Sequence, residues 1–373
     1  MNSWRFRPGP PAGAIGAAVA LATLLLLPSP AHAAPPRYQV SMVPAGVASG
    51  GELALDQHRH ELFVADNNAP MRTTGNDVIP SETPVTPAVS VFDTTTRRPV
   101  RSIDLSNQPG GLMMIGPVEL IPTPQVPDGL AIDPKRGRVL VTNAHAGGIT
   151  VFDINAKRVT PRNLTPLPYS HPMGAVANPV TGRFYVGLNG TGKVAVFDSG
   201  SGRLVGDIPN LHKASFVDID VPRNRLYVGN ADYEAKTNNF VAVVDLRTNR
   251  VIKKIATPSN SRPKVDPTTG RIWANSFDTG KISIIDPVSL QIVTTIDTRT
   301  TPSKIAIDAQ RRRVYAANLQ KKSITVISAD SGAILATVPT GTAAVHTIVV
   351  DQASGVAYGT QHIGNKLTIL TPR

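Results

Sequence analysis

The chain has 373 residues, including 33 proline and 30 glycine but no cysteine, which excludes disulfides, thiol catalysis and thiolate metal sites. Apolar residues make up 41% of the chain, above the level of disordered sequences, and the length suits one large β-rich domain. The formal net charge of +12 fits contact with nucleic acid, anionic lipid or acidic polymers, but an ordinary basic solvated surface is the favoured interpretation.

The first 33 residues have the pattern of a cleaved signal peptide. Arg5 and Arg7 form a short basic start, residues 12–27 are apolar, and Ala31-His32-Ala33 is a small-residue cleavage site. The sequence therefore predicts a protein that is secreted or periplasmic, with a single domain over residues 34–373. After cleavage no segment is long and apolar enough to span a membrane.

The rest of the chain repeats one unit of short strands. Each unit opens with a strand that ends in Asp or Asn, and from the second unit on these ends are 45, 42, 46, 42 and 43 residues apart. A repeat of this length cannot bury its own apolar face, so neighbouring copies must stack. The terminal residues are Asp56, Asp133, Asn178, Asp220, Asp266, Asp308 and Asp351.

Each unit continues in the same order. A turn such as DPKRGR, NPVTGR or DPTTGR follows the first strand, with Asp accepting turn hydrogen bonds, Pro setting φ and Gly supplying the left-handed position. A second strand such as FYVGLN, a third such as VAVFD and, in most units, a fourth such as LVGDI come next.

Seven first strands predict an all-β, seven-bladed β-propeller with four-stranded blades. The last unit ends after its third strand, and a lone alternating strand at residues 37–43 supplies the missing fourth. Pairing the two termini closes the ring and removes exposed sheet edges. A β-sandwich also has many short strands, but not this regular spacing.

The second strands FYVGLN, LYVGN, VLVTN and VYAAN, each between a DPxxGR-like turn and a VFD-like strand, resemble the YVTN repeat. The chain after residue 33 resembles the YVTN-repeat propellers, including the exported YncE-like bacterial group. The resemblance implies the propeller fold and no particular reaction. The units with IWANS and VAYGT depart most from the pattern.

Longer connections gather on one predicted face. Loops between second and third strands, and between blades, lie on what we call the upper face; the remaining turns lie on the lower face. Insertions at residues 67–87, 106–126 and 231–239 all belong to the upper face. Long loops on one rim of a rigid scaffold are where binding often occurs, so we predict a small molecule or a protein partner there.

Aligning the first strands on their terminal residues predicts a polar ring at the upper mouth of the channel. Glu52, Arg262 and Lys304 stand four residues before the end, and Asp128 and His346 stand five before it. His145 lies on a loop above. These residues suit an anionic or zwitterionic ligand. The alternative is a water-filled channel whose ions pair with one another.

A metal-dependent enzyme is a second hypothesis. The regucalcin and gluconolactonase propellers hold a divalent cation in the channel with oxygen ligands, and Glu52, Asp128 and Asp218 are weak candidates for such a site here. Asp218 instead suits pairing with Lys264 of the next blade. Because the chain has no GxSxG, HExxH or phosphate-loop motif, the sequence favours a binding or scaffold protein, and a divalent cation is the cofactor that stays possible.

The lower rim is rich in arginine and suggests a third hypothesis. Arg311, Arg312 and Arg313 are the densest group, and such a ring could hold a polyanion such as nucleic acid. Ion pairs with the turn aspartates are the alternative. Aromatic residues that could stack on bases do not alternate with these arginines, which disfavours nucleic acid.

Overall fold

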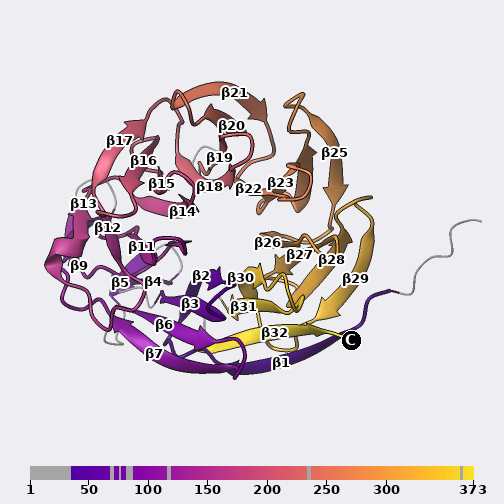
Figure 1. The fold of residues 1–373 in the computed structure, drawn as a ribbon, viewed down its shortest axis with the longest axis horizontal. Coiled ribbons are helices and arrows are strands. Elements are labelled where there is room, and N and C mark those ends of the chain that lie inside the picture. The colour runs from indigo at the N-terminus through magenta and orange to yellow at the C-terminus, as the bar shows by residue number, and fades with distance from the viewer. Residues whose placement is uncertain are drawn as a thin grey trace, which may run out of the picture. The chain divides into compact units, whose positions relative to one another are not determined.

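Seven four-stranded sheets stand around a central axis within Pro36–Arg373 (Figure 1). The computed structural model describes residues 35–67, 71–74, 77–80, 87–115, 119–232, 237–361 and 364–373. The predicted signal peptide lies outside these residues. Among them, no helix has the length and apolar character needed to cross a bilayer.

Each blade is an antiparallel sheet whose strands follow one another from the channel outwards. The blades are, in chain order, β2(Gly50–Asp56), β3(Glu61–Asp66), β6(Ala88–Asp93) and β7(Arg98–Asp104); β10(Leu130–Asp133), β11(Arg138–Asn143), β12(Gly148–Asp153) and β13(Leu164–Pro166); β14(Pro172–Asn178), β15(Arg183–Leu188), β16(Lys193–Asp198) and β17(Leu204–Ile208); β18(Ala214–Asp220), β19(Arg225–Asn230), β20(Phe240–Asp245) and β21(Arg250–Ala256); β22(Ser261–Val265), β23(Ile272–Ser276), β24(Lys281–Ile285) and β25(Ile292–Asp297); β26(Pro302–Asp308), β27(Arg313–Asn318), β28(Ser323–Ser328) and β29(Ile334–Pro339); and β30(Val345–Val350), β31(Ala357–Gln361), β32(Lys366–Pro372) and β1(Tyr38–Pro44).

The ring closes as the sequence predicts. The seventh blade takes its outer strand from the other end of the chain: β1 pairs with β32 from Tyr38↔Pro372 to Pro44↔Lys366. Figure 1 shows these indigo and yellow strands side by side. The predicted seven-bladed propeller with four-stranded blades is therefore confirmed.

The terminal aspartates organise the lower turns. Asp56 Oδ1 accepts hydrogen bonds from the backbone N–H groups of His58 and Arg59 at 3.0 and 3.2 Å, and Asp308 Oδ1 accepts one from Arg311 N–H at 2.9 Å. These bonds end each inner strand and reverse the chain. Five inner strands end at the expected Asp or Asn, while β22 and β30 end one residue before it.

The apolar core lies between blades. Seven clusters of buried side chains each join residues of two neighbouring blades; Phe184 and Phe197 of the third blade, for example, pack with Leu140 of the second. Trp273 and Tyr227 are fully buried in such clusters. Since every blade faces two others, all apolar faces are covered.

The first two insertions each contain a two-stranded hairpin. The connection between β3 and β6 contains β4(Met71–Thr74) and β5(Asp77–Pro80), and the connection between the first and second blades contains β8(Gly111–Ile115) and β9(Glu119–Thr123). The third insertion lies partly outside the described residues. In the described part the one helical element is the 3-10 turn η1(Pro161–Asn163).

Candidate functional site

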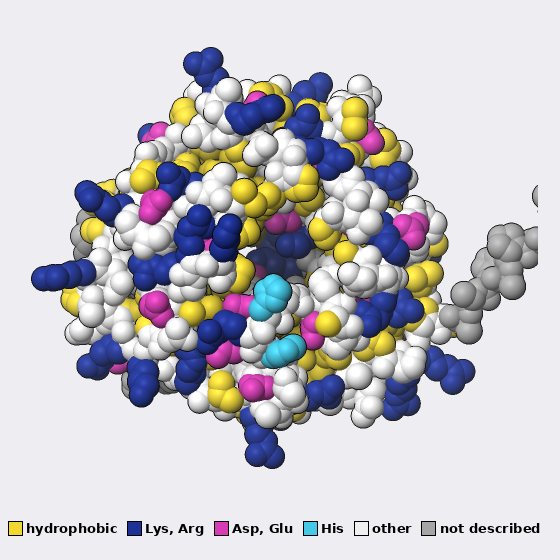
Figure 2. All heavy atoms as spheres, in the orientation of Figure 1, with side chains coloured by type: hydrophobic (Ala, Val, Ile, Leu, Met, Phe, Trp, Pro, Cys, Tyr) yellow, Lys and Arg dark blue, Asp and Glu magenta, His cyan; other side chains and the backbone are white. Residues whose placement is uncertain are grey.

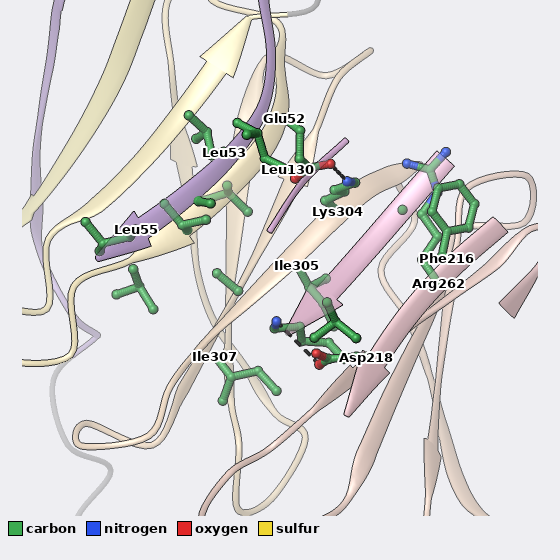
Figure 3. A pocket seen from close by; sticks show the side chains of 18 of the residues that line it. Glu52, Leu53, Leu55, Leu130, Phe216, Asp218, Arg262, Lys304, Ile305 and Ile307 are labelled. Atoms are coloured by element: carbon green, nitrogen blue, oxygen red, sulfur yellow. Dashed lines mark hydrogen bonds and ion pairs between the residues drawn. The ribbon is translucent and has the colours of Figure 1, made fainter. Parts of the chain in front are cut away.

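The inner strands enclose a cavity of about 360 Å³ along the channel (Figure 3). Five charged side chains line it: Glu52, Asp218, Arg262, Lys264 and Lys304. Figure 2 shows the hollow at the centre of the ring, with basic and acidic side chains visible inside it. A cavity of this size lies within the usual range for small-molecule sites.

Lys304 of β26 reaches past the seventh blade to Glu52 of β2, and their side chains form an ion pair (Figure 3). Thr347 of β30, between them in the ring, donates a hydrogen bond to Glu52 Oε1 at 3.0 Å. Burial lowers the pKa of Lys304 to about 8, although contact with a carboxylate acts the other way by favouring the ammonium. The side chain is 22% exposed, so it is reached by channel water.

Arg262 of β22 is held in place by aromatic rings. Its guanidinium lies 4.3 Å from the ring centre of Phe216 and 5.3 Å from that of Phe277. Its Nη1 donates to the carbonyl oxygen of Ser303 at 2.6 Å, which ties the fifth blade to the sixth. Cation–π contacts of this kind orient a planar guanidinium, and the side chain lines the same cavity as Lys304.

A second charged layer lies further along the channel. Asp218 of β18 pairs with Lys264 of β22 at 3.4 Å and accepts a hydrogen bond from Val265 N–H at 2.7 Å. The predicted pairing of Asp218 with Lys264 is therefore confirmed. Apolar side chains lie in the cavity wall between and below the two charged layers (Figure 3).

Asp128 lies just before β10 and is not part of the cavity wall. Its N–H donates to Thr142 O at 2.8 Å, and Asn67 Nδ2 donates to its Oδ1 at 3.4 Å. The next residue must be glycine, because a Cβ at Gly129 would lie 2.2 Å from Met173 O. Burial raises the pKa of Asp128, while the charges of His145 and Arg262 oppose that shift. The three side chains therefore interact electrostatically.

The candidate histidines His145 and His346, and the neighbouring His171, are not among the residues of the cavity wall. The rings of His145 and His171 meet edge to face with centroids 6.0 Å apart. Burial, together with the charges of His145 and Lys213, lowers the pKa of His171 to about 4. His346 is fixed through its backbone, since its carbonyl oxygen accepts a hydrogen bond from Ser303 Oγ at 2.5 Å.

The metal-site candidates do not converge. Glu52 is bonded to Lys304 and Thr347, Asp218 to Lys264, and Asp128 lies outside the cavity wall. Within the described ranges, no group of three or more His, Cys, Asp or Glu side chains is placed to hold a metal ion.

The candidate arginines of the lower rim form ion pairs and hydrogen bonds within the protein. Arg311 bonds Asp308 and, at 3.1 and 3.0 Å, two carbonyl oxygens of the next blade. Arg312 holds both carboxylate oxygens of Asp266 at 3.0 and 2.9 Å, and Arg313 donates to the Tyr38 hydroxyl at 3.1 Å. The hydrogen bond with Asp266 raises the pKa of Arg312.

The structure therefore brings three of the six predicted ligand-binding residues, Glu52, Arg262 and Lys304, into one cavity. Sequence reasoning missed the aromatic partners of Arg262. The sequence could have indicated Phe216, because it occupies the same strand position as Arg262 in the preceding blade. It could not have indicated Phe277, because that residue lies on a loop outside the repeated positions.

Comparison with known proteins finds similarity in a short segment and in the fold. No family model matches the chain. The uncharacterized protein YncE of Salmonella typhi and that of Salmonella typhimurium are each 31% identical over 83 residues, which is 22% of this chain and 24% of each relative. The match thus spans about a quarter of these relatives.

Among solved structures, a chain of the Kuenenia stuttgartiensis hydrazine synthase is similar with a TM-score of 0.69 and 14% sequence identity. The similarity covers 88% of this chain and 97% of that one. At this identity the likeness shows the propeller architecture alone.

Proposed function

We propose that this YncE-like seven-bladed propeller is a binding protein that takes a small anionic ligand into the upper part of its channel. The observation that carries the proposal is the placement of Arg262 and Lys304 in the wall of one cavity of about 360 Å³. The guanidinium of Arg262 contacts the rings of Phe216 and Phe277, and a pre-oriented guanidinium suits a carboxylate or phosphate group.

Thermal unfolding with acetate or inorganic phosphate as probe tests this function. A ligand that binds only the folded state raises the melting temperature. We expect a concentration-dependent rise for the wild-type chain that Arg262→Ala abolishes. Arg203→Ala removes an exposed arginine of the third blade and is the matched control. No rise with either anion, or an equal rise in Arg262→Ala, would contradict the proposal.

The basic amino terminus, apolar run and Ala-x-Ala site support the further proposal that the protein acts outside the cytoplasm. Amino-terminal sequencing of the protein recovered from the periplasm or culture medium should begin at Ala34. Recovery in the cytoplasm with residues 1–33 intact would contradict it.

A further inference from the structure

Most uncharged side chains of the cavity wall are apolar, and the polar ones among them are Gln57, Asn275 and Gln352. Leu53, Leu55, Leu130, Ile305 and Ile307, which we call the apolar girdle, line the channel between and below the charged layers (Figure 3). Leu53, Leu130, Ile305 and Ile307 are 4–5% exposed. A ligand that enters past Arg262 and Lys304 therefore meets hydrocarbon next.

The charge of the wall limits the charge of the ligand. Arg262, Lys264 and Lys304 contribute three positive charges, and Glu52 and Asp218 contribute two negative ones, which leaves a formal surplus of one positive charge. A monoanion matches this wall better than a phosphate dianion or a dicarboxylate.

The size of the cavity limits the ligand as well. With ~30 Å³ for each water-sized group, about 360 Å³ holds about a dozen non-hydrogen atoms. The hydroxyl groups of a sugar acid would lose their water against the apolar girdle without gaining partners there. An aliphatic tail instead gains affinity for each methylene that it buries.

We infer, building on the proposed function, that the ligand is a small monocarboxylate with an apolar tail. Its carboxylate lies at Arg262 and Lys304, and its tail lies against Leu53, Leu130 and Ile305 (Figure 3). The Lys304–Glu52 pair stays in place, because drawing Lys304 away would leave the Glu52 carboxylate half-buried without its cation.

Calorimetric titration with straight-chain carboxylates tests the inference. The series runs from acetate through butanoate to hexanoate, and hexanedioate is the matched control because it adds a second carboxylate at the tail end. Full burial of a methylene corresponds to about fourfold in affinity, so hexanoate should bind at least about tenfold more tightly than acetate. Hexanedioate and inorganic phosphate should bind more weakly than hexanoate.

A variant pair locates the tail. Ile305→Ala should reduce the gain between acetate and hexanoate, whereas Ile334→Ala, a 48% exposed isoleucine of the same blade, should leave it unchanged. If Ile305→Ala does not fold, the wild-type series decides alone.

The outcomes separate the two proposals. Acetate binding that depends on Arg262 without a gain for longer chains, or tighter binding of hexanedioate or phosphate than of hexanoate, overturns the monocarboxylate and leaves the anion-binding function intact. Absence of any Arg262-dependent binding overturns both.

Discussion

Positively charged side chains have different partners at the lower and upper ends of the channel strands. At the lower end, Arg136, Arg223 and Arg311 each follow the terminal Asp by three residues and bond it at 3.1, 3.0 and 3.4 Å. Each also donates to a backbone carbonyl of the next blade's turn. At the upper end, Arg262 and Lys304 stand four residues before the terminal Asp and line the cavity.

The difference shows that the number of arginines on a face does not predict a polyanion site. The lower arginines join neighbouring blades, so their charges are partly matched by turn aspartates and carbonyl groups. At the upper end, Arg262 and Lys304 instead line the cavity of about 360 Å³. Four changes to the protein or to the pH test this contrast.

Of the four changes, removal of a lower-rim arginine should lower the free energy of unfolding most. Arg312→Ala leaves the buried carboxylate of Asp266 without its bidentate partner, and breaking such a pair costs about 3–5 kcal/mol. Urea unfolding measures the loss. The matched control is Arg247→Ala, whose arginine is 72% exposed beside its own Asp245 and whose loss should leave stability unchanged. Equal stability of the two variants would show that the lower rim does not hold the blades together.

The channel pair should matter less for stability. Lys304→Met leaves Glu52, which is 19% exposed, beside a neutral side chain, and we expect a loss of about 1–3 kcal/mol because channel water screens part of the charge. The double variant Glu52→Gln with Lys304→Met should recover most of that loss. If the double variant is as unstable as the sum of the single variants, the two residues do not interact.

Anion binding should weaken in alkaline solution. With a pKa of about 8, Lys304 is an ammonium at lower pH and becomes neutral as the pH rises through that value. We therefore expect acetate affinity to fall by up to about tenfold between pH 7 and 9, since one favourable charge is lost. Lys304→Arg keeps its charge in this range and should bind acetate equally at both pH values. The same fall in Lys304→Arg would assign the effect to another group.

Replacement of Asp128 should have the smallest effect, and that effect is on acetate affinity. Asp128 lies near Arg262 without lining the cavity, and burial raises its pKa, so it repels an anion through intervening atoms only in its ionised form. Asp128→Asn removes that charge and should strengthen acetate binding by about threefold. Weaker binding in this variant, measured by calorimetry, would mean that Asp128 positions the ligand.

The repeat explains why so much of the fold could be predicted. The spacing of the terminal Asp and Asn residues determines the blade number, and the unfinished last unit determines how β1 closes the ring. The same alignment placed Glu52, Arg262 and Lys304 together, because equal offsets from the turn put residues at equal depth in the channel.

What the alignment could not predict depends on side-chain reach and on irregular backbone. The Lys304 side chain of the sixth blade extends past the seventh blade to pair with Glu52 of the first. The register of the strands does not predict that contact. Asp128 stands five residues before the terminal Asp, whereas Glu52, Arg262 and Lys304 stand four before it. It also precedes β10, which begins at Leu130, and it lies outside the cavity wall. Phe277 reaches Arg262 from a loop that has no repeated position.

A crystal structure with 6-bromohexanoate would show where the channel binds a carboxylate, because anomalous scattering locates the bromine. The upper-channel site predicts the carboxylate at Arg262 and the bromine within the apolar girdle, against Ile305. Bromine bound on the lower rim or outside the channel, with the cavity occupied only by water, would contradict it.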